Sequence, residues 1–361
     1  MNEDAYSRLA RVLDTLPSGF PSTESGVEIK LLEKIFTPEE ASLFCEMRLT
    51  PETAEQVAGR TGHPLEWLKE TLETMAGKGQ LLGIRVGENR LYKMVPWVVG
   101  IYEFQVDRID EEMAELVDQY ITVFQEQCFP QAPHFAQTLA VEETIPVDQE
   151  ALPYEKVSAI IEKCRSFRLA DCICKKKQGL LGKPCDRPME VCLWAVPVPG
   201  YFEQFPGYRT ISRDEAYALM KKAEEASLVH MTSNTQAGHY FICNCCKCCC
   251  PFLTSINETG IPASLVIDSH CYAEIDPEKC SGCGVCADER CQVNALAEEQ
   301  DEYRVVRERC IGCGLCVSAC PEEAVRLVRK DAADRTTPPE SENAWFEERG
   351  LKRGVDFSAY K

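Results

Sequence analysis

The stretch Cys280-Ser281-Gly282-Cys283-Gly284-Val285-Cys286 returns 30 residues later as Cys310-Ile311-Gly312-Cys313-Gly314-Leu315-Cys316. Each run of three cysteines is followed by one more, Cys291 after the first and Cys320 after the second. A spacing of two residues lets three thiolates converge from one tight loop on three corners of a metal cluster. The glycines allow backbone N–H groups to approach the sulfurs. Since the fourth corner needs a ligand from elsewhere, the repeat predicts two 4Fe-4S clusters and electron transfer between them.

Residues 272–330 resemble the bacterial two-cluster ferredoxins, in which the fourth cysteine of each run serves the other cluster. The resemblance implies two ligand sets, which are Cys280, Cys283, Cys286 and Cys320 for cluster one, and Cys310, Cys313, Cys316 and Cys291 for cluster two. The pair Cys320-Pro321 follows the family pattern. The first half departs from it, because four residues precede Cys291 where three are usual and Gln292 replaces the expected proline. Zinc, which C-x-x-C pairs also bind, is the alternative, and the register of eight cysteines without a histidine disfavours it.

Ten further cysteines lie in the middle of the chain, between residues 172 and 250, and are candidate ligands of additional metal sites. They are Cys172, Cys174, Cys185, Cys192, Cys243, Cys245, Cys246, Cys248, Cys249 and Cys250. Neighbouring side chains point in different directions, so only subsets of them can share one metal. One such subset, Cys243, Cys246 and Cys249, repeats the C-x-x-C-x-x-C register. One or two further iron–sulfur clusters, structural zinc and a free thiol relay all remain open at this point.

The order of these motifs over residues 165–330 resembles a group of 4Fe-4S ferredoxin-like proteins of anaerobes. The resemblance implies iron–sulfur binding and redox work, without naming a substrate. The basic triplet 175–177 stands beside Cys174 and would offset the charge of a thiolate-bound cluster. Three other cysteines, Cys45, Cys128 and Cys164, are expected to be small core residues.

The N-terminal part reads as three helices and a hairpin. Thr37 and Thr53 are helix-capping residues with Glu or Gln three positions later, and Pro64 begins the third helix. Two short apolar segments, 81–86 and 90–95, flank a turn. This pattern, over residues 30–97, resembles a winged-helix domain of the MarR kind. The third helix carries several glutamates, so we expect protein docking or dimerisation here rather than contact with nucleic acid.

We therefore expect a multidomain, α-rich chain with an N-terminal winged helix, a helical cysteine-rich middle domain and an α+β two-cluster ferredoxin module. The predicted segments are an N-terminal helix and linker (1–29), the winged-helix-like domain (30–100), the cysteine-rich domain (101–271), the ferredoxin module (272–330) and a C-terminal tail (331–361). Two amphipathic patterns predict helices inside the cysteine-rich domain, one over residues 109–127 and one that follows a capping box at Ser212.

The composition limits the partners. The net charge is −19, from 39 lysine and arginine residues against 58 aspartate and glutamate residues. Such a surface repels phosphate backbones and anionic lipids. No apolar run reaches the length of a membrane span and no signal peptide is apparent, so we expect a cytoplasmic protein with reduced thiols.

Three hypotheses of function follow. The first is electron transfer between these clusters and a partner oxidoreductase. The second is a redox-sensing transcriptional regulator that uses the winged helix. The third is a reductase that acts at an unusual cluster of the middle domain. A homodimer through the N-terminal region is compatible with each of them.

Overall fold

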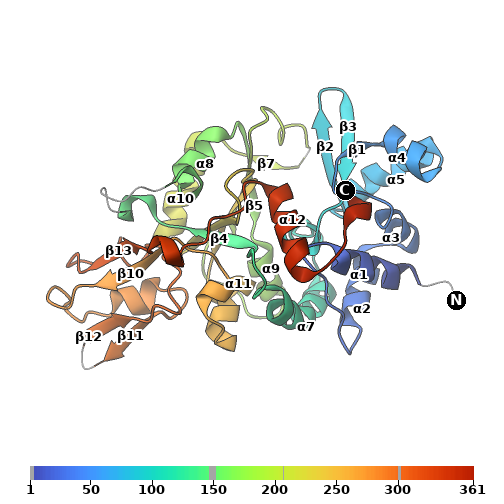
Figure 1. Ribbon diagram of the computed structural model, residues 1–361. Helices are drawn as coiled ribbons and strands as arrows, with labels where there is room; N and C mark the ends of the chain where they lie inside the picture. The colour runs from blue at the N-terminus through green and yellow to red at the C-terminus, as the bar shows by residue number, and fades with distance from the viewer. Residues whose placement is uncertain (1–3, 146–151, 206, 300–301) are drawn as a thin grey trace. The chain divides into compact units, whose positions relative to one another are not determined.

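The computed structural model describes residues 4–145, 152–205, 207–299 and 302–361. The chain forms two compact units (Figure 1). Unit 1 comprises Met1–Gln131, Lys176–Lys183 and Phe346–Lys361, and unit 2 comprises Ala132–Lys175 and Pro184–Trp345. The segment 272–330 thus belongs to the same unit as most of the cysteine-rich middle.

Unit 1 is built mainly from helices, with one small sheet. Its helices are α1 (Ala5–Thr15), α2 (Val27–Ile35), α3 (Pro38–Phe44), α4 (Ala54–Thr61), α5 (Leu65–Gly77), α6 (Tyr102–Phe104) and α7 (Glu111–Cys128). The capping boxes expected at Thr37 and Thr53 are both present, at the starts of α3 and α4. Helix α7 covers the amphipathic pattern and buries its apolar side chains, so this helix prediction is confirmed.

The small sheet of unit 1 has three antiparallel strands in the order β1-β3-β2. They are β1 (Glu52–Thr53), β2 (Leu82–Val86) and β3 (Asn89–Lys93). Strands β2 and β3 form the expected hairpin, with Gly87 at the turn. The added strand β1 precedes α4, so that the elements follow one another as helix, strand, helix, helix and hairpin.

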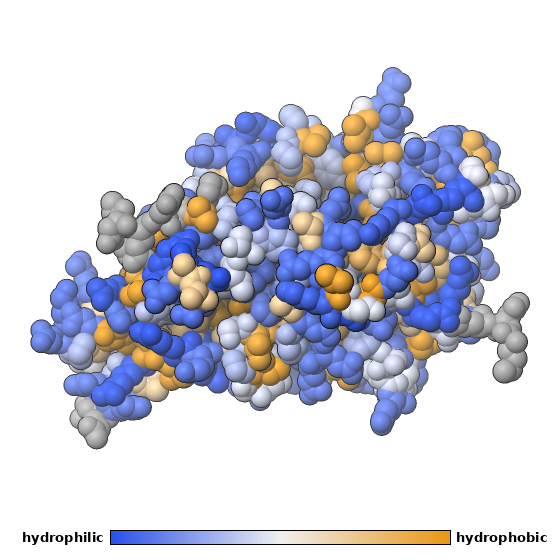
Figure 2. All heavy atoms as spheres, in the orientation of Figure 1, coloured by the Kyte–Doolittle hydropathy of each residue, from blue (hydrophilic) through white to orange (hydrophobic). Residues whose placement is uncertain are grey.

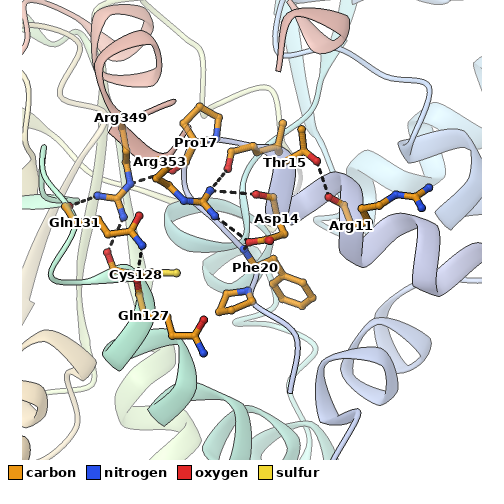
Figure 3. A network of polar contacts seen from close by, with 12 residues as sticks. Arg11, Asp14, Thr15, Pro17, Phe20, Gln127, Cys128, Gln131, Arg349 and Arg353 are labelled. Atoms are coloured by element: carbon orange, nitrogen blue, oxygen red, sulfur yellow. Dashed lines mark hydrogen bonds and ion pairs between the residues drawn. The ribbon is translucent and has the colours of Figure 1, made fainter. Parts of the chain in front are cut away.

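Residues from the C-terminal helix α12 (Glu342–Arg353) complete unit 1 (Figure 3). The Arg349 side chain is fully buried. Its guanidinium donates hydrogen bonds to the carbonyl oxygens of Pro17 at 3.0 Å and Cys128 at 2.6 Å, and to that of Gln131. Arg353 donates to the carbonyl of Leu16 at 2.6 Å, one helical turn further on. Buried carbonyls that lack a donor are costly, so these two arginines stabilise unit 1 strongly.

Unit 2 contains a six-stranded antiparallel sheet in the order β4-β8-β9-β6-β5-β7. The strands are β4 (Ala136–Leu139), β5 (Ser166–Asp171), β6 (Glu190–Val196), β7 (Arg209–Thr210), β8 (Val229–Ser233) and β9 (Phe241–Cys245). Helices α8 (Val157–Lys163) and α10 (Arg213–Glu225) share one apolar core with β5, β6 and β9. The helix α10 begins with the capping box expected at Ser212.

This sheet corrects the expectation of a helical middle domain. Strands β6 and β8 are the reason why the pattern was missed. The segment of β6 is apolar at almost every position, and β8 is buried on both faces. The segment of β6 therefore lacks the alternation of polar and apolar residues by which a strand is recognised, and β8 alternates over only five residues.

The rest of unit 2 consists of short elements around two small sheets. They are α9 (Ile173–Leu180), which begins in unit 2, α11 (Pro251–Thr254), β10 (Cys271–Ile275) paired with β13 (Val325–Arg329), and β11 (Leu296–Glu299) paired with β12 (Glu302–Val305). Hydrophilic residues cover most of the face shown in Figure 2, as the composition implies. In the described part of the chain, no helix combines the length and the apolar character that crossing a membrane requires.

Candidate metal centres

Two cavities lie in the segment 272–330, and each is lined by four cysteines. The first has Cys280, Cys283, Cys286 and Cys320 in its wall, together with Ile275, Tyr303 and Val325. The second has Cys291, Cys310, Cys313 and Cys316, together with Ala273, Leu296 and Val305. Each cavity therefore takes three cysteines from one run and the fourth from the other. Cys286 and Cys316 belong to the same apolar core, so the two cavities adjoin.

Backbone N–H groups point at the sulfurs in both cavities. Ala295 N–H donates to Cys291 Sγ at 3.2 Å, and Ala324 N–H donates to Cys320 Sγ at 3.3 Å. In both cases the donor follows its cysteine by four residues, so the two halves of the module repeat each other. Such hydrogen bonds stabilise thiolates and help to set the potential of a bound cluster.

The turn between Cys310 and Cys313 is fitted tightly to the neighbouring strand. Gly312 has a φ of +60°, and a Cβ atom there would lie 2.2 Å from the Cys271 carbonyl oxygen. A larger residue would push the turn away from β10. The Ala273 N–H of that strand donates to Cys310 Sγ at 3.3 Å, so this close packing also places a donor on a candidate ligand.

Burial keeps several of these thiols neutral when no metal is bound. Burial raises the pKa of Cys286 to about 11 and that of Cys313 to about 12. A metal binds the thiolate and displaces the proton. The donor set of each cavity consists of sulfur alone, which is the set that 4Fe-4S clusters use. The residues therefore fit such a cluster in each cavity.

The ten cysteines of the middle segment fall into two groups in space. The tetrathiol group consists of Cys185, Cys246, Cys248 and Cys249, whose sulfurs all lie within 4.8 Å of one another. The six-thiol group is a string of neighbouring thiols joined by hydrogen bonds, and it consists of Cys174, Cys172, Cys192, Cys243, Cys245 and Cys250.

Pairing of neighbouring strands assembles the six-thiol group. Strand β6 lies between β5 and β9, and Cys192 on β6 pairs with Ala170 of β5. The next residue of β6, Leu193, pairs with Ile242 of β9, the residue before Cys243. Cys172 follows directly after β5. Three chain segments that are distant in sequence thus deliver thiols to one end of the sheet.

The tetrathiol group forms where β9 ends. After this strand the chain turns, and the Cys250 N–H donates to the Cys246 carbonyl at 3.2 Å. Cys185 comes from the loop that follows α9, and its sulfur lies 3.8 Å from Cys246 Sγ and 3.4 Å from Cys248 Sγ. The Cys248 side chain is exposed, whereas Cys246 and Cys249 are buried.

The C-x-x-C-x-x-C register suggested that Cys243, Cys246 and Cys249 could share one metal, but the structure divides these three residues between the two groups. Cys243 lies within β9, where the chain is extended, and its sulfur joins those of Cys192 and Cys245. The other two cysteines lie in the turn beyond the strand. Cysteines at this spacing do not converge on one point when one of them lies in a strand and the others lie in a turn.

Each group holds thiols that ionise readily. The hydrogen bonds that Cys248 shares with Cys246 and Cys249 lower the pKa of Cys248 to about 2. Hydrogen bonds from Cys192 and Cys245 lower the pKa of Cys243 to about 5. Thiolates are the metal-binding form of cysteine, so both groups are suited to metals.

Residues 303–326 match the family model of the 4Fe-4S binding domain. This segment contains four of the eight cysteines that line the two cavities. The chain thus has a ferredoxin-type iron–sulfur domain with at least one 4Fe-4S cluster. None of the curated proteins and none of the solved structures matches the chain.

The structure distinguishes between the lysines of the basic triplet. Lys175 is buried in unit 2, where its ammonium donates to the Pro188 carbonyl at 2.8 Å and acts electrostatically on Cys172 and Cys246. The next two lysines bind groups of unit 1, namely the Val106 carbonyl and the Asp118 carboxylate. Within the triplet, Lys175 is therefore the lysine that offsets negative charge at the middle thiols.

The three cysteines expected in the core, Cys45, Cys128 and Cys164, are buried. Burial raises the pKa of Cys128 to about 12 and that of Cys164 to about 11, which makes both thiols unreactive. They show that burial alone does not make a cysteine a ligand in this chain.

The sequence drew attention to Gln292 only as a departure from a family pattern, and its role was missed. Its side-chain oxygen accepts a hydrogen bond from the Lys247 N–H at 3.0 Å, and its own carbonyl accepts one from Asn257 at 3.0 Å. Gln292 is buried and follows Cys291, a lining residue of the second cavity. A proline could not make the side-chain contact, so this substitution connects the ferredoxin module to the turn that bears the tetrathiol group.

Proposed function

We propose that this chain is an iron–sulfur electron-transfer protein that carries two 4Fe-4S clusters in its ferredoxin module and exchanges electrons with a partner oxidoreductase. The observation that carries the proposal is the sorting of eight cysteines into two cavities of four. Cluster one is bound by Cys280, Cys283, Cys286 and Cys320, and cluster two by Cys310, Cys313, Cys316 and Cys291.

The arrangement of the module supports electron transfer rather than a structural role. The cavities share an apolar core, which shortens the step between the two clusters and keeps water out of it. Cys283 is exposed, so that cluster one comes near the surface where a partner can dock. Direct N–H donors to Cys310, Cys291 and Cys320 stabilise the negative charge that a reduced cluster gains.

We further propose that the six-thiol group binds an additional iron–sulfur cluster. Six thiolates exceed the four that one ion or one cube needs, and this favours a centre of several irons. The contact of Gln292 with Lys247 brings the loop of the middle thiols next to a ligand of cluster two. Electrons would pass along this line between the middle of unit 2 and the ferredoxin module.

Iron and sulfide analysis of cysteine variants tests the assignment. After anaerobic reconstitution, we expect clearly more than eight irons per wild-type chain. Cys280→Ser and Cys320→Ser should each remove about four irons, and the double variant should also remove about four, because one cluster is lost. The combination of Cys280→Ser with Cys291→Ser should remove about eight.

Cys45→Ser is the matched control, since Cys45 is buried in unit 1 far from any cavity cysteine in sequence. If the wild type contains only eight irons per chain, the additional cluster in the six-thiol group would be refuted. Equal losses for Cys280→Ser alone and for its combination with Cys291→Ser would contradict the crossed assignment.

For the N-terminal region we propose a winged helix that docks a protein or a second copy of this chain. The strand β1, which adds to the hairpin, supports this fold. Contact with DNA is disfavoured because Arg90 of the hairpin binds Glu73 of α5 at 2.9 Å. Retardation of its own promoter fragment in a gel, with strong salt dependence, would instead support the regulator hypothesis.

A further inference from the structure

The tetrathiol group is much more compact than the ligand sets of the two cavities. Cys248 Sγ lies 3.4 Å from Cys185 Sγ, 3.4 Å from Cys246 Sγ and 3.5 Å from Cys249 Sγ. In the described part of the chain, this is the one group of three or more Cys, His, Asp or Glu ligand atoms that all lie within 4.8 Å of one another. No three sulfurs of either ferredoxin cavity meet that limit.

These distances agree with the geometry of a single tetrahedral ion. A metal–sulfur bond of about 2.3 Å places the four sulfurs of a tetrahedral site about 3.8 Å apart. A 4Fe-4S cube holds each thiolate on a different iron, beyond a different corner, so its ligands must stand much farther apart. The cavities of the ferredoxin module leave that space and the tetrathiol group does not.

From this we infer that Cys185, Cys246, Cys248 and Cys249 form a mononuclear tetrathiolate site for one Zn²⁺ or Fe²⁺ ion. The inference goes beyond the electron-transfer function and does not rest on it. Four protein thiolates fill all positions of a tetrahedral ion, which is typical of a structural site. The ion would fasten the loop of Cys185 to the turn that follows β9.

The surroundings of the group suit this assignment. Four thiolates and one divalent ion leave two negative charges, and the buried ammonium of Lys175 acts on Cys246. The turn is fixed from the other side by the Gln292 side chain, which accepts the Lys247 N–H. Exposure of Cys248 gives an ion access from solvent.

Metal and acid-labile sulfide analysis of the full chain distinguishes one ion from a cube. We expect Cys185→Ser to lose one ion per chain, zinc or iron, while the sulfide content stays at the wild-type value. Cys192→Ser, from the six-thiol group, and Cys45→Ser should both retain that ion. The identity of the lost metal decides between Zn²⁺ and Fe²⁺, and either result supports a mononuclear site.

A second variant distinguishes the loss of one metal ligand from misfolding of the chain. Histidine also binds both ions, so Cys185→His should retain the ion that Cys185→Ser loses. Growth with added Co²⁺ should give the visible bands of a tetrahedral thiolate site in the wild type, and Cys185→Ser should weaken them. Loss of about four sulfides along with iron in Cys185→Ser would overturn the inference in favour of a cube. So would a wild-type chain with no metal that depends on Cys185.

The outcome is independent of the ferredoxin clusters. Cys283→Ser should lower iron and sulfide together whether or not the tetrathiol group binds an ion. If Cys283→Ser loses cluster one but no metal ion depends on Cys185, the proposed electron-transfer function would stand. The mononuclear tetrathiolate site would then be refuted.

Discussion

His239 is a polar residue whose protonation opposes folding. Burial lowers the pKa of its imidazole to about 4. The ring nitrogen Nδ1 lies 3.3 Å from the Thr232 hydroxyl, and Nε2 is buried without a hydrogen-bond partner among the described residues. The charge of Lys163 also lowers the pKa of the ring, so these surroundings disfavour an imidazolium ion.

The stability of unit 2 should therefore fall below neutral pH because of His239. Between pH 6.5 and pH 4 the unfolded chain binds a proton that the folded chain does not, so stability decreases as the pH falls through this window. At pH 5 the loss from this one group is about 2 kcal/mol relative to pH 7. Thermal unfolding of wild type and His239→Gln at both pH values measures it.

The difference between the two proteins isolates the imidazole from all other titrating groups. The wild type should lose more stability than His239→Gln between pH 7 and pH 5. The same exchange at the partly exposed His63, which lies near Glu46, is the control. Equal losses in wild type and His239→Gln would show that the buried ring does not govern this pH range.

Individual cysteines also show how much of the candidate metal sites can be predicted from the sequence. The C-x-x-C runs act locally, so spacing alone predicts that three cysteines meet, and a family resemblance supplied the crossed fourth ligand. The partition of the ten middle cysteines was beyond prediction. Whether Cys243 faces Cys192 or Cys246 depends on the pairing of β6 with β9, segments about fifty residues apart.

The helix starts were the elements that the sequence predicted best. A capping box needs only a hydroxyl residue and a Glu or Gln three residues later, and all three expected boxes are present. The sheet of unit 2 was missed because β6 is apolar at almost every position and β8 is only five residues long.

At the first of these caps, Thr37→Ala should destabilise unit 1 by about 1 kcal/mol, the usual loss for an N-cap hydroxyl. The Thr37 hydroxyl accepts the Glu40 N–H at 3.2 Å, and the Glu40 carboxylate accepts the Thr37 N–H at 2.9 Å. Denaturant unfolding followed by circular dichroism gives the change. Glu39→Gln, at an exposed site on the same helix, should change stability by less than about 0.5 kcal/mol. A loss there that matches that of Thr37→Ala would argue against the cap.

Between elements, the hydrogen bond of Gln292 with the turn after β9 should contribute more to the free energy of unfolding than the Thr37 cap does. Gln292→Ala removes a buried side chain and leaves the half-buried Lys247 N–H without its acceptor, and we expect a loss of about 2 kcal/mol in unit 2. Faster release of the tetrathiol ion should accompany it, because the turn loses one of its two anchors. Glu298→Ala, at an exposed position of β11, is the control. A variant as stable as wild type would mean that solvent replaces this hydrogen bond.

At the scale of the whole molecule, the candidate metal ligands lie in one unit. All eighteen cysteines that line the cavities or form the two middle groups lie within Ala132–Lys175 and Pro184–Trp345. Unit 1 contains Cys45 and Cys128, both buried, and its stability comes from helix packing and the arginines of α12. The two units should therefore respond differently to chelators and to mutations.

We expect two unfolding transitions that can be shifted independently. Removal of the metals should lower the transition of unit 2, since bound metal contributes to folding free energy, and leave that of unit 1 in place. Arg349→Met should do the reverse, with a loss of about 3 kcal/mol in unit 1, because three carbonyls lose the donor that Arg349 provides. Differential scanning calorimetry with and without chelator distinguishes the transitions.

Lys352→Ala provides the control for that measurement, because Lys352 is half exposed and binds only Glu348 within its own helix. Its effect should stay below about 0.5 kcal/mol. If removal of the metals shifted both transitions equally, the two units would not unfold separately.

The discontinuity of unit 1 has a consequence for biosynthesis. Residues 346–361, which carry Arg349 and Arg353, emerge from the ribosome after every cysteine of unit 2. Unit 2 can thus begin to collect its metals while unit 1 still lacks the arginines that satisfy the carbonyls of Pro17 and Cys128. The order of the chain thus allows metal loading to precede the closure of unit 1.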